Sequence, residues 1–124
     1  MDNRTAGFRL CAESTKAVRI ECRIGGSDLN PYLAMAAQLA AGIKGIEDEL
    51  ELSPPADGDT YEGESGLIPQ NLRDAHAALK DSTMLRAAMG DDVVDHYARA
   101  AEVELEDFDR VVTDYEVARG FERA

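Results

Sequence analysis

The most constraining feature of this sequence is residues 18–24, Val-Arg-Ile-Glu-Cys-Arg-Ile, in which apolar and charged residues alternate strictly. Successive side chains of a β-strand point to opposite faces of a sheet, so this period of two predicts a strand. One face of the strand then carries Arg19, Glu21 and Arg23. These side chains form either a solvent-exposed charge ladder, which adds little to stability, or a site for a divalent cation and anionic oxygens.

A second strand is expected just before the first. The alternation recurs from Ala6 to Cys11, and residues 12–17 form a polar connection that is long enough for a hairpin loop. The two strands are therefore predicted to pair antiparallel. This pairing would place Arg9 on the charged face of residues 18–24, because the other face must be the buried one.

The length and composition limit the class of protein. A chain of 124 residues suits one domain or part of a larger one, and 44% hydrophobic with 31% charged residues predicts a soluble, globular protein. No apolar run approaches the roughly 20 residues that span a bilayer, and the first residues lack the layout of a signal peptide. Cys11 and Cys22 are too few for a disulfide framework, so a cytoplasmic location is expected.

The charge is distributed unevenly along the chain. The formal net charge is −12, yet residues 1–44 hold six basic and four acidic residues, whereas the remainder holds seven basic and 21 acidic residues. A basic N-terminal third on an acidic chain indicates a localised anion site. Nucleic acid is not expected as a partner, because most of the surface would repel its phosphates.

The middle of the chain predicts a helix and a loop. Asn30 is a favourable N-cap and Pro31 a favourable first residue, so a helix is expected from Pro31 to about Glu49. Its many alanines and few polar residues predict that this helix is buried. The acidic, glycine-rich residues 56–66 predict an irregular surface loop, because their spacing does not match an EF-hand calcium loop.

The rest of the chain predicts further helices. They are expected over residues 71–80, over 84–89, and from Asp92 to Arg119, where apolar residues recur every three or four positions. His76 and His96 are expected to be structural or exposed rather than metal ligands. The predicted fold class is α+β: a short antiparallel β pair, a buried alanine-rich helix, an irregular loop and two or three further helices, including a long C-terminal one.

Three motifs follow one another near the N-terminus. They are Asn-Arg-Thr-Ala-Gly-Phe-Arg at residues 3–9, Arg-Ile-Glu-Cys-Arg at 19–23, and Gly-Gly-Ser-Asp-Leu-Asn-Pro-Tyr-Leu at 25–33. In order, spacing and residue type they resemble the C-terminal end of the glutamine synthetase catalytic domain, and residues 105–116 resemble the terminal helix of that family. The resemblance covers residues 1–124 and implies a C-terminal portion that lacks the N-terminal β-grasp domain and the first part of the catalytic domain.

The resemblance also implies the chemistry. The family joins glutamate to ammonia, using ATP, through γ-glutamyl phosphate, and metal ions and arginines neutralise charge on the reacting oxygens. Glu21 matches a metal-binding carboxylate, for Mg²⁺ or Mn²⁺, and Arg23 matches the catalytic arginine that meets the transferred phosphoryl group and glutamate. Arg4 matches a second catalytic position, which contacts both nucleotide and substrate. The nucleotide-binding cations implied by the resemblance are Arg4, Arg9, Lys16 and Arg19.

Several points stay open at the level of sequence. The family's other metal carboxylates are not in this chain, so these residues alone are expected to be inactive, and the full-length protein is expected to be a homo-oligomer, by resemblance a dodecamer. Residues 25–30 resemble branches that use larger amines at least as well as those that use ammonia. The alternatives are a non-catalytic synthetase-like module, which would bind a partner through its acidic helix, and an anion-binding domain with unrelated chemistry.

Overall fold

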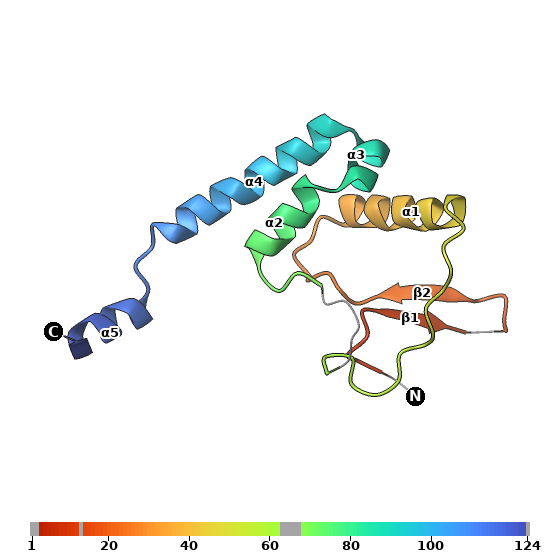
Figure 1. Ribbon diagram of the computed structural model, residues 1–124, viewed down its shortest axis with the longest axis horizontal. Coiled ribbons are helices and arrows are strands. Elements are labelled where there is room, and N and C mark those ends of the chain that lie inside the picture. Colours follow the sequence, from red (N-terminus) through yellow and green to blue (C-terminus); the bar gives the residue numbers. More distant parts are fainter. Residues whose placement is uncertain (1–2, 13, 63–67, 124) are drawn as a thin grey trace. The chain divides into compact units, whose positions relative to one another are not determined.

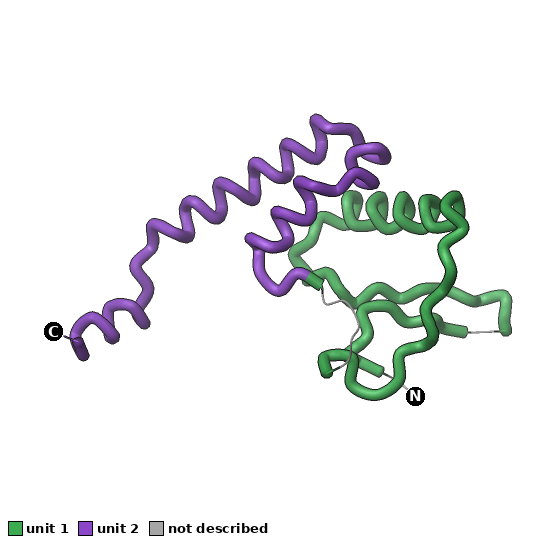
Figure 2. Tube along the Cα trace, in the orientation of Figure 1, with its two compact units in different colours: residues 1–68 green, residues 69–124 purple. Residues whose placement is uncertain are grey.

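The computed structural model describes residues 3–12, 14–62 and 68–123. The chain divides into two compact units, residues 1–68 and residues 69–124, here called unit 1 and unit 2 (Figure 2). Within the described residues, unit 1 contains a β-hairpin and one helix, and unit 2 is helical (Figure 1). None of the described helices combines the length and apolar character of a membrane-spanning segment.

The β-hairpin of unit 1 consists of β1 (Phe8–Cys11) and β2 (Arg19–Cys22), which pair antiparallel. The predicted hairpin is thus confirmed, although both strands are shorter than the alternating segments. The chain leaves β1 at Ala12, whose φ of 58° lies in the left-handed region. One further backbone hydrogen bond extends the strand pairing beyond β2, in which the Arg23 N–H donates to the Gly7 carbonyl at 2.8 Å.

The helix of unit 1 is α1 (Pro31–Glu47), and its start is as predicted. Asn30 Oδ1 accepts hydrogen bonds from the backbone N–H groups of Tyr32 at 3.0 Å and Leu33 at 3.4 Å, so two otherwise unpaired donors are satisfied. Pro31 occupies the first helical position, where a missing N–H has no cost.

The predicted burial of α1 is wrong. No residue of α1 is buried, and Tyr32, Leu39 and Ile46 have 80%, 67% and 79% of their surface exposed. The half-buried face of α1 carries mainly alanine and glycine. The larger exposed side chains lie on a different stripe, which no other described part of unit 1 covers; the stripe comprises Tyr32, Met35, Leu39, Ile43 and Ile46.

Unit 2 is built around α4 (Asp91–Asp109), against which α2 (Leu72–Lys80) and α3 (Thr83–Met89) pack. Among the described residues, Val94 and Ala98 of α4 form the buried apolar core. They are four positions apart and therefore lie on one face of the helix. The core is small because two short helices, α2 and α3, pack against α4.

Capping residues mark the ends of the shorter helices of unit 2. Asn71 Oδ1 accepts from the Asp74 N–H at 2.9 Å at the start of α2, and Ser82 Oγ accepts from the Leu85 N–H at 3.2 Å at the start of α3. Gly90 separates α3 from α4 with φ of 88°, a conformation that favours glycine. These boundaries agree with the predicted ones to within one or two residues.

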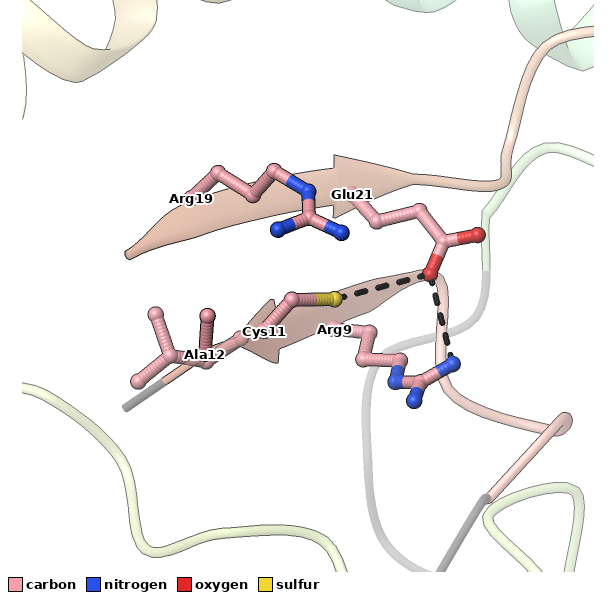
Figure 3. Close-up of a pocket in the computed structure, with 6 residues that line it drawn as sticks. Arg9, Cys11, Ala12, Arg19 and Glu21 are labelled. Carbon is pink, nitrogen blue, oxygen red and sulfur yellow. Dashed lines mark hydrogen bonds and ion pairs between the residues drawn. The ribbon is translucent and has the colours of Figure 1, made fainter. Parts of the chain in front are cut away.

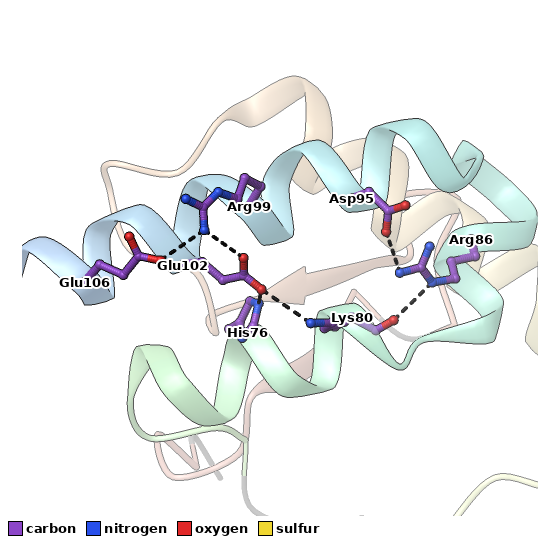
Figure 4. A network of polar contacts seen from close by, with 7 residues as sticks. All are labelled: His76, Lys80, Arg86, Asp95, Arg99, Glu102 and Glu106. Atoms are coloured by element: carbon purple, nitrogen blue, oxygen red, sulfur yellow. Dashed lines mark hydrogen bonds and ion pairs between the residues drawn. The ribbon is translucent and has the colours of Figure 1, made fainter.

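Charged side chains connect the helices of unit 2 (Figure 4). Arg86 of α3 donates to Asp91 at 3.0 Å, to Asp95 at 2.7 Å and to the Lys80 carbonyl at 3.0 Å. His76 Nε2 of α2 lies 3.3 Å from Glu102 Oε1 of α4 without hydrogen-bond geometry. His76 therefore lies at the contact between α2 and α4.

The predicted long C-terminal helix is interrupted. Helix α4 ends at Asp109, and α5 (Asp114–Arg123) begins after residues 110–113. Thr113 and Glu116 form a reciprocal pair: the Thr113 N–H donates to Glu116 Oε2 at 2.8 Å, and the Glu116 N–H donates to Thr113 Oγ1 at 3.3 Å. This capping box starts a new helix and therefore ends the continuity that the apolar period suggested.

Candidate functional site

The charged face of the hairpin brings together three side chains that were predicted to share it. Arg9 lies directly opposite Glu21 in the β1–β2 register, and its Nη1 is 3.6 Å from Glu21 Oε2. Arg23 approaches the same oxygen with Nη2 at 3.2 Å (Arg9 and Glu21 are shown in Figure 3). One carboxylate therefore lies between two guanidinium groups that come from different segments of the chain.

The same face extends to the other end of the hairpin. Cys11 and Arg19 are opposite each other in the register, and Cys11 Sγ donates to Glu21 Oε2 at 3.9 Å. A surface cavity of about 670 Å³ lies here. Its lining residues are Arg9, Leu10, Cys11, Ala12, Arg19 and Glu21. The cavity wall thus combines two guanidinium groups with one carboxylate, an excess of positive charge that suits an anionic ligand.

Two of the predicted cations lie elsewhere. Lys16 is exposed in the connection between the strands and does not line the cavity. Arg4 is exposed in a turn before β1, where the Thr5 N–H donates to Asn3 Oδ1 at 3.0 Å. Arg4 is nevertheless linked to the hairpin, because Arg23 Nη1 donates to the carbonyl of the neighbouring Asn3 at 3.1 Å.

Two contributors to this region were missed by the sequence reasoning. The sequence predicts only that Cys11 is part of a strand, although the alternation of that strand places it on the charged face with Arg9. For the segment that contains Gly58 and Thr60 the sequence predicts an irregular surface loop. It lies against Asn3 and Thr5, 55 residues earlier in the chain, and no local sequence signal could have indicated this contact.

The residues present fit a metal ion only in part. In the ranges that the structure describes, no group of three or more His, Cys, Asp or Glu side chains is arranged to hold a metal. Glu21 supplies one carboxylate, which fits a Mg²⁺ ion whose other ligands are phosphate oxygens and water. A centre of several ions does not fit these residues alone.

Comparison with known proteins decides the family. Residues 1–120 match the model of the glutamine synthetase catalytic domain. The chain belongs to the glutamine synthetase family. The resemblance of the three N-terminal motifs is thereby confirmed, and the α+β arrangement of hairpin and helices is consistent with part of that catalytic domain.

The names of curated relatives of this chain specify different products or amines. The chain is 46% identical over 122 residues to a gamma-glutamylethanolamide synthetase of Streptomyces coelicolor, covering 98% of this chain and 26% of that protein. It is 35% identical over 121 residues to a glutamate–isopropylamine ligase of a Pseudomonas species, covering 95% and 26%. It is 32% identical over 125 residues to a glutamine synthetase of Methanosarcina mazei, covering 94% and 28%. The chain thus spans about a quarter of the length of these relatives.

Proposed function

We propose that this chain contributes the phosphate-binding arginines and one metal-binding carboxylate to an ATP-dependent ligase that joins the γ-carboxylate of glutamate to an amine through γ-glutamyl phosphate. The observation that carries the proposal is the convergence of Arg9 and Arg23 on Glu21 across the hairpin. Phosphoryl transfer requires cations that neutralise phosphate oxygens and a metal that bridges them. Membership of the glutamine synthetase family supports this chemistry over an unrelated anion-binding role.

The proposed roles are those that the family resemblance implies, and the geometry of the charged face supports the ones proposed for Arg9, Arg19, Glu21 and Arg23. Glu21 provides one ligand for the Mg²⁺ or Mn²⁺ that accompanies ATP. Arg23, whose guanidinium group contacts Glu21, meets the transferred phosphoryl group and glutamate. Arg9 and Arg19 line the cavity and bind nucleotide phosphates. Arg4 contacts both nucleotide and substrate from the turn before β1, and Lys16 binds phosphate from the connection between the strands.

The acceptor amine has two candidates. Ammonia is the simplest, because several curated relatives are glutamine synthetases. A larger amine is the second, and the 46% identity to a gamma-glutamylethanolamide synthetase favours it over the 32–35% identities to glutamine synthetases. The full-length homo-oligomer and its cytoplasmic location remain predictions.

Calorimetry of this chain with ATP, with and without Mg²⁺, tests the site. The wild-type chain should bind ATP, and Mg²⁺ should strengthen the binding. Glu21→Ala should remove the effect of Mg²⁺ while leaving metal-free binding in place. Glu51→Ala, an exposed carboxylate in the same unit, is the matched control and should behave as wild type. Absence of ATP binding by the wild-type chain, or an undiminished Mg²⁺ effect in Glu21→Ala, would contradict the proposal.

The reaction itself is tested on the full-length protein that carries this segment. Release of ADP is measured with glutamate, ATP and either ammonia, ethanolamine or isopropylamine. Turnover should require glutamate and one of these amines, and the preferred amine identifies the branch. A full-length protein that binds ATP but transfers no glutamyl group to any of them would support the alternative of a non-catalytic synthetase-like module.

A further inference from the structure

Arg4 occupies the centre of a turn whose two flanking residues are both bonded. Asn3 Oδ1 accepts from the Thr5 N–H at 3.0 Å and from Thr5 Oγ1 at 2.7 Å. A side-chain oxygen that accepts from the backbone two residues later forms an Asx-turn, which restricts the backbone of the residue between. The backbone from which the Arg4 side chain projects is thus held locally.

A distant segment closes this turn from the C-terminal side. The Thr60 N–H donates to Thr5 Oγ1 at 2.9 Å, and Thr60 Oγ1 donates to the Thr5 carbonyl at 2.7 Å. Both bonds are part-buried. One threonine therefore bonds the side chain and the backbone of the residue that follows Arg4, and this pair of bonds fixes both the position and the orientation of the turn.

The N-terminal side of the turn is held in the same way. Asn3 Nδ2 donates to the Gly58 carbonyl at 2.8 Å, and the Asn3 carbonyl accepts from Arg23 Nη1 at 3.1 Å. The turn is thus bonded to residues 58–60 on one side and to Arg23 on the other. Since Arg23 also contacts Glu21, these bonds connect residues 58–60 to the charged face of the hairpin.

We propose that Thr60 is a positioning residue that holds the turn from which Arg4 binds ATP. The inference rests on the proposed function, in which Arg4 binds ATP. An arginine whose side chain is already ordered before the ligand binds contributes more to phosphate binding. Less conformational entropy of the side chain is then lost on binding. Thr60 does not contact the ligand in this role; it acts through Thr5.

Three variants of this chain separate positioning from general folding. Thr60→Val removes the hydroxyl that donates to the Thr5 carbonyl, and Thr60→Ser retains it. Thr5→Val removes the partner hydroxyl on the other side of the same contact. Thr83→Val, at an exposed threonine in unit 2, is the matched control. Circular dichroism verifies that all variants retain the helix content of the wild type.

Two readouts are measured on each variant. The first is the order of the Arg4 Nε–H group by ¹⁵N relaxation, assigned with Arg4→Lys, with the Arg9 group as internal control. The second is the Kd for ATP by calorimetry. Thr60→Val and Thr5→Val should disorder Arg4 but not Arg9 and weaken ATP binding about five- to tenfold, the size expected when a disordered Arg4 loses one hydrogen bond to a phosphate. Thr60→Ser and Thr83→Val should match the wild type.

The outcomes distinguish this inference from the proposed function. A wild-type chain that binds no ATP would overturn the proposed function and, with it, the ligand-directed role of Thr60. A chain that binds ATP, with Arg4 order and Kd unchanged in Thr60→Val, would overturn the positioning role alone. Equal loss of order at Arg4 and Arg9, or failure of Thr60→Ser to restore both readouts, would also overturn it, because those results indicate general loosening of unit 1.

Discussion

Arg9 and Glu21 lie directly opposite each other on β1 and β2, with Arg9 Nη1 3.6 Å from Glu21 Oε2. Their side chains are 46% and 45% exposed, so the pair adds little to stability. The ion pair instead keeps the guanidinium group of Arg9 beside the Glu21 carboxylate, which is proposed to bind a metal. The cluster therefore bears on ligand binding more than on folding.

Arg9→Met should weaken metal-free ATP binding about tenfold, because one charge-assisted hydrogen bond to a phosphate is worth roughly 1.5 kcal/mol. The affinity of the wild-type chain should also fall as salt is added, since exposed charges are screened. Arg73→Met, at an exposed arginine of α2 that pairs with Asp109, is the control and should leave the affinity unchanged. Calorimetry at two salt concentrations checks both outcomes; equal affinities for Arg9→Met and wild type would contradict the role of Arg9.

Val94→Ala should destabilise unit 2 by about 2 kcal/mol, because it removes two methyl groups from a side chain that is 1% exposed. Val112→Ala removes the same groups from a side chain that is 71% exposed, and should have little effect. Amide hydrogen exchange in α4 measures the difference. Equal protection in the two variants would show that Val94 does not form the core of unit 2.

The start of α5 should depend on pH. Hydrogen bonds from the Thr113 N–H and then from its hydroxyl lower the pKa of Glu116. A carboxyl group with a lowered folded pKa stabilises the fold above its unfolded pKa, and this contribution is lost as the pH falls through the folded value. The helicity of α5, followed by NMR chemical shifts, should therefore decrease below the usual range of glutamate titration.

Glu116→Gln provides the control for this pH effect. Glutamine can still accept from the Thr113 N–H but does not titrate, so the acid-induced change at the start of α5 should shrink. Thr113→Val should lower α5 helicity at neutral pH, because the Glu116 N–H loses its acceptor. An identical pH profile for wild type and Glu116→Gln would assign the transition to other carboxylates.

Arg86→Lys should loosen α3 despite conserving the charge. A single ammonium group cannot reproduce the three directed bonds that Arg86 makes to Asp91, Asp95 and the Lys80 carbonyl. Faster amide exchange in α3 is expected. Arg99→Lys, at an arginine whose partners Glu102 and Glu106 lie on its own helix, should leave α3 exchange unchanged. Unchanged exchange in Arg86→Lys would mean that helix packing alone holds α3.

The interrupted C-terminal helix shows how two local signals can compete. The apolar period across residues 92–119 predicted one helix, and it is present in both α4 and α5. Thr113 and Glu116 also carry the spacing of a capping box, and these residues decide the boundary. The spacing of apolar residues indicates which face of a helix is apolar. A capping motif indicates where the first backbone N–H groups of a helix find their acceptors. Giving the cap precedence would have predicted the break.

Local sequence patterns sufficed to predict the hairpin, the face shared by Arg9, Glu21 and Arg23, and the helix starts at Asn30 and Asn71. Strand alternation and capping depend on residues that are neighbours in the chain. Other features depend on contacts between segments that are far apart in the sequence. The contact of Thr60 with Thr5 and the exposure of the apolar stripe on α1 both depend on which distant segments meet. Periodicity indicates that a surface is apolar or polar, but it does not specify what lies against that surface.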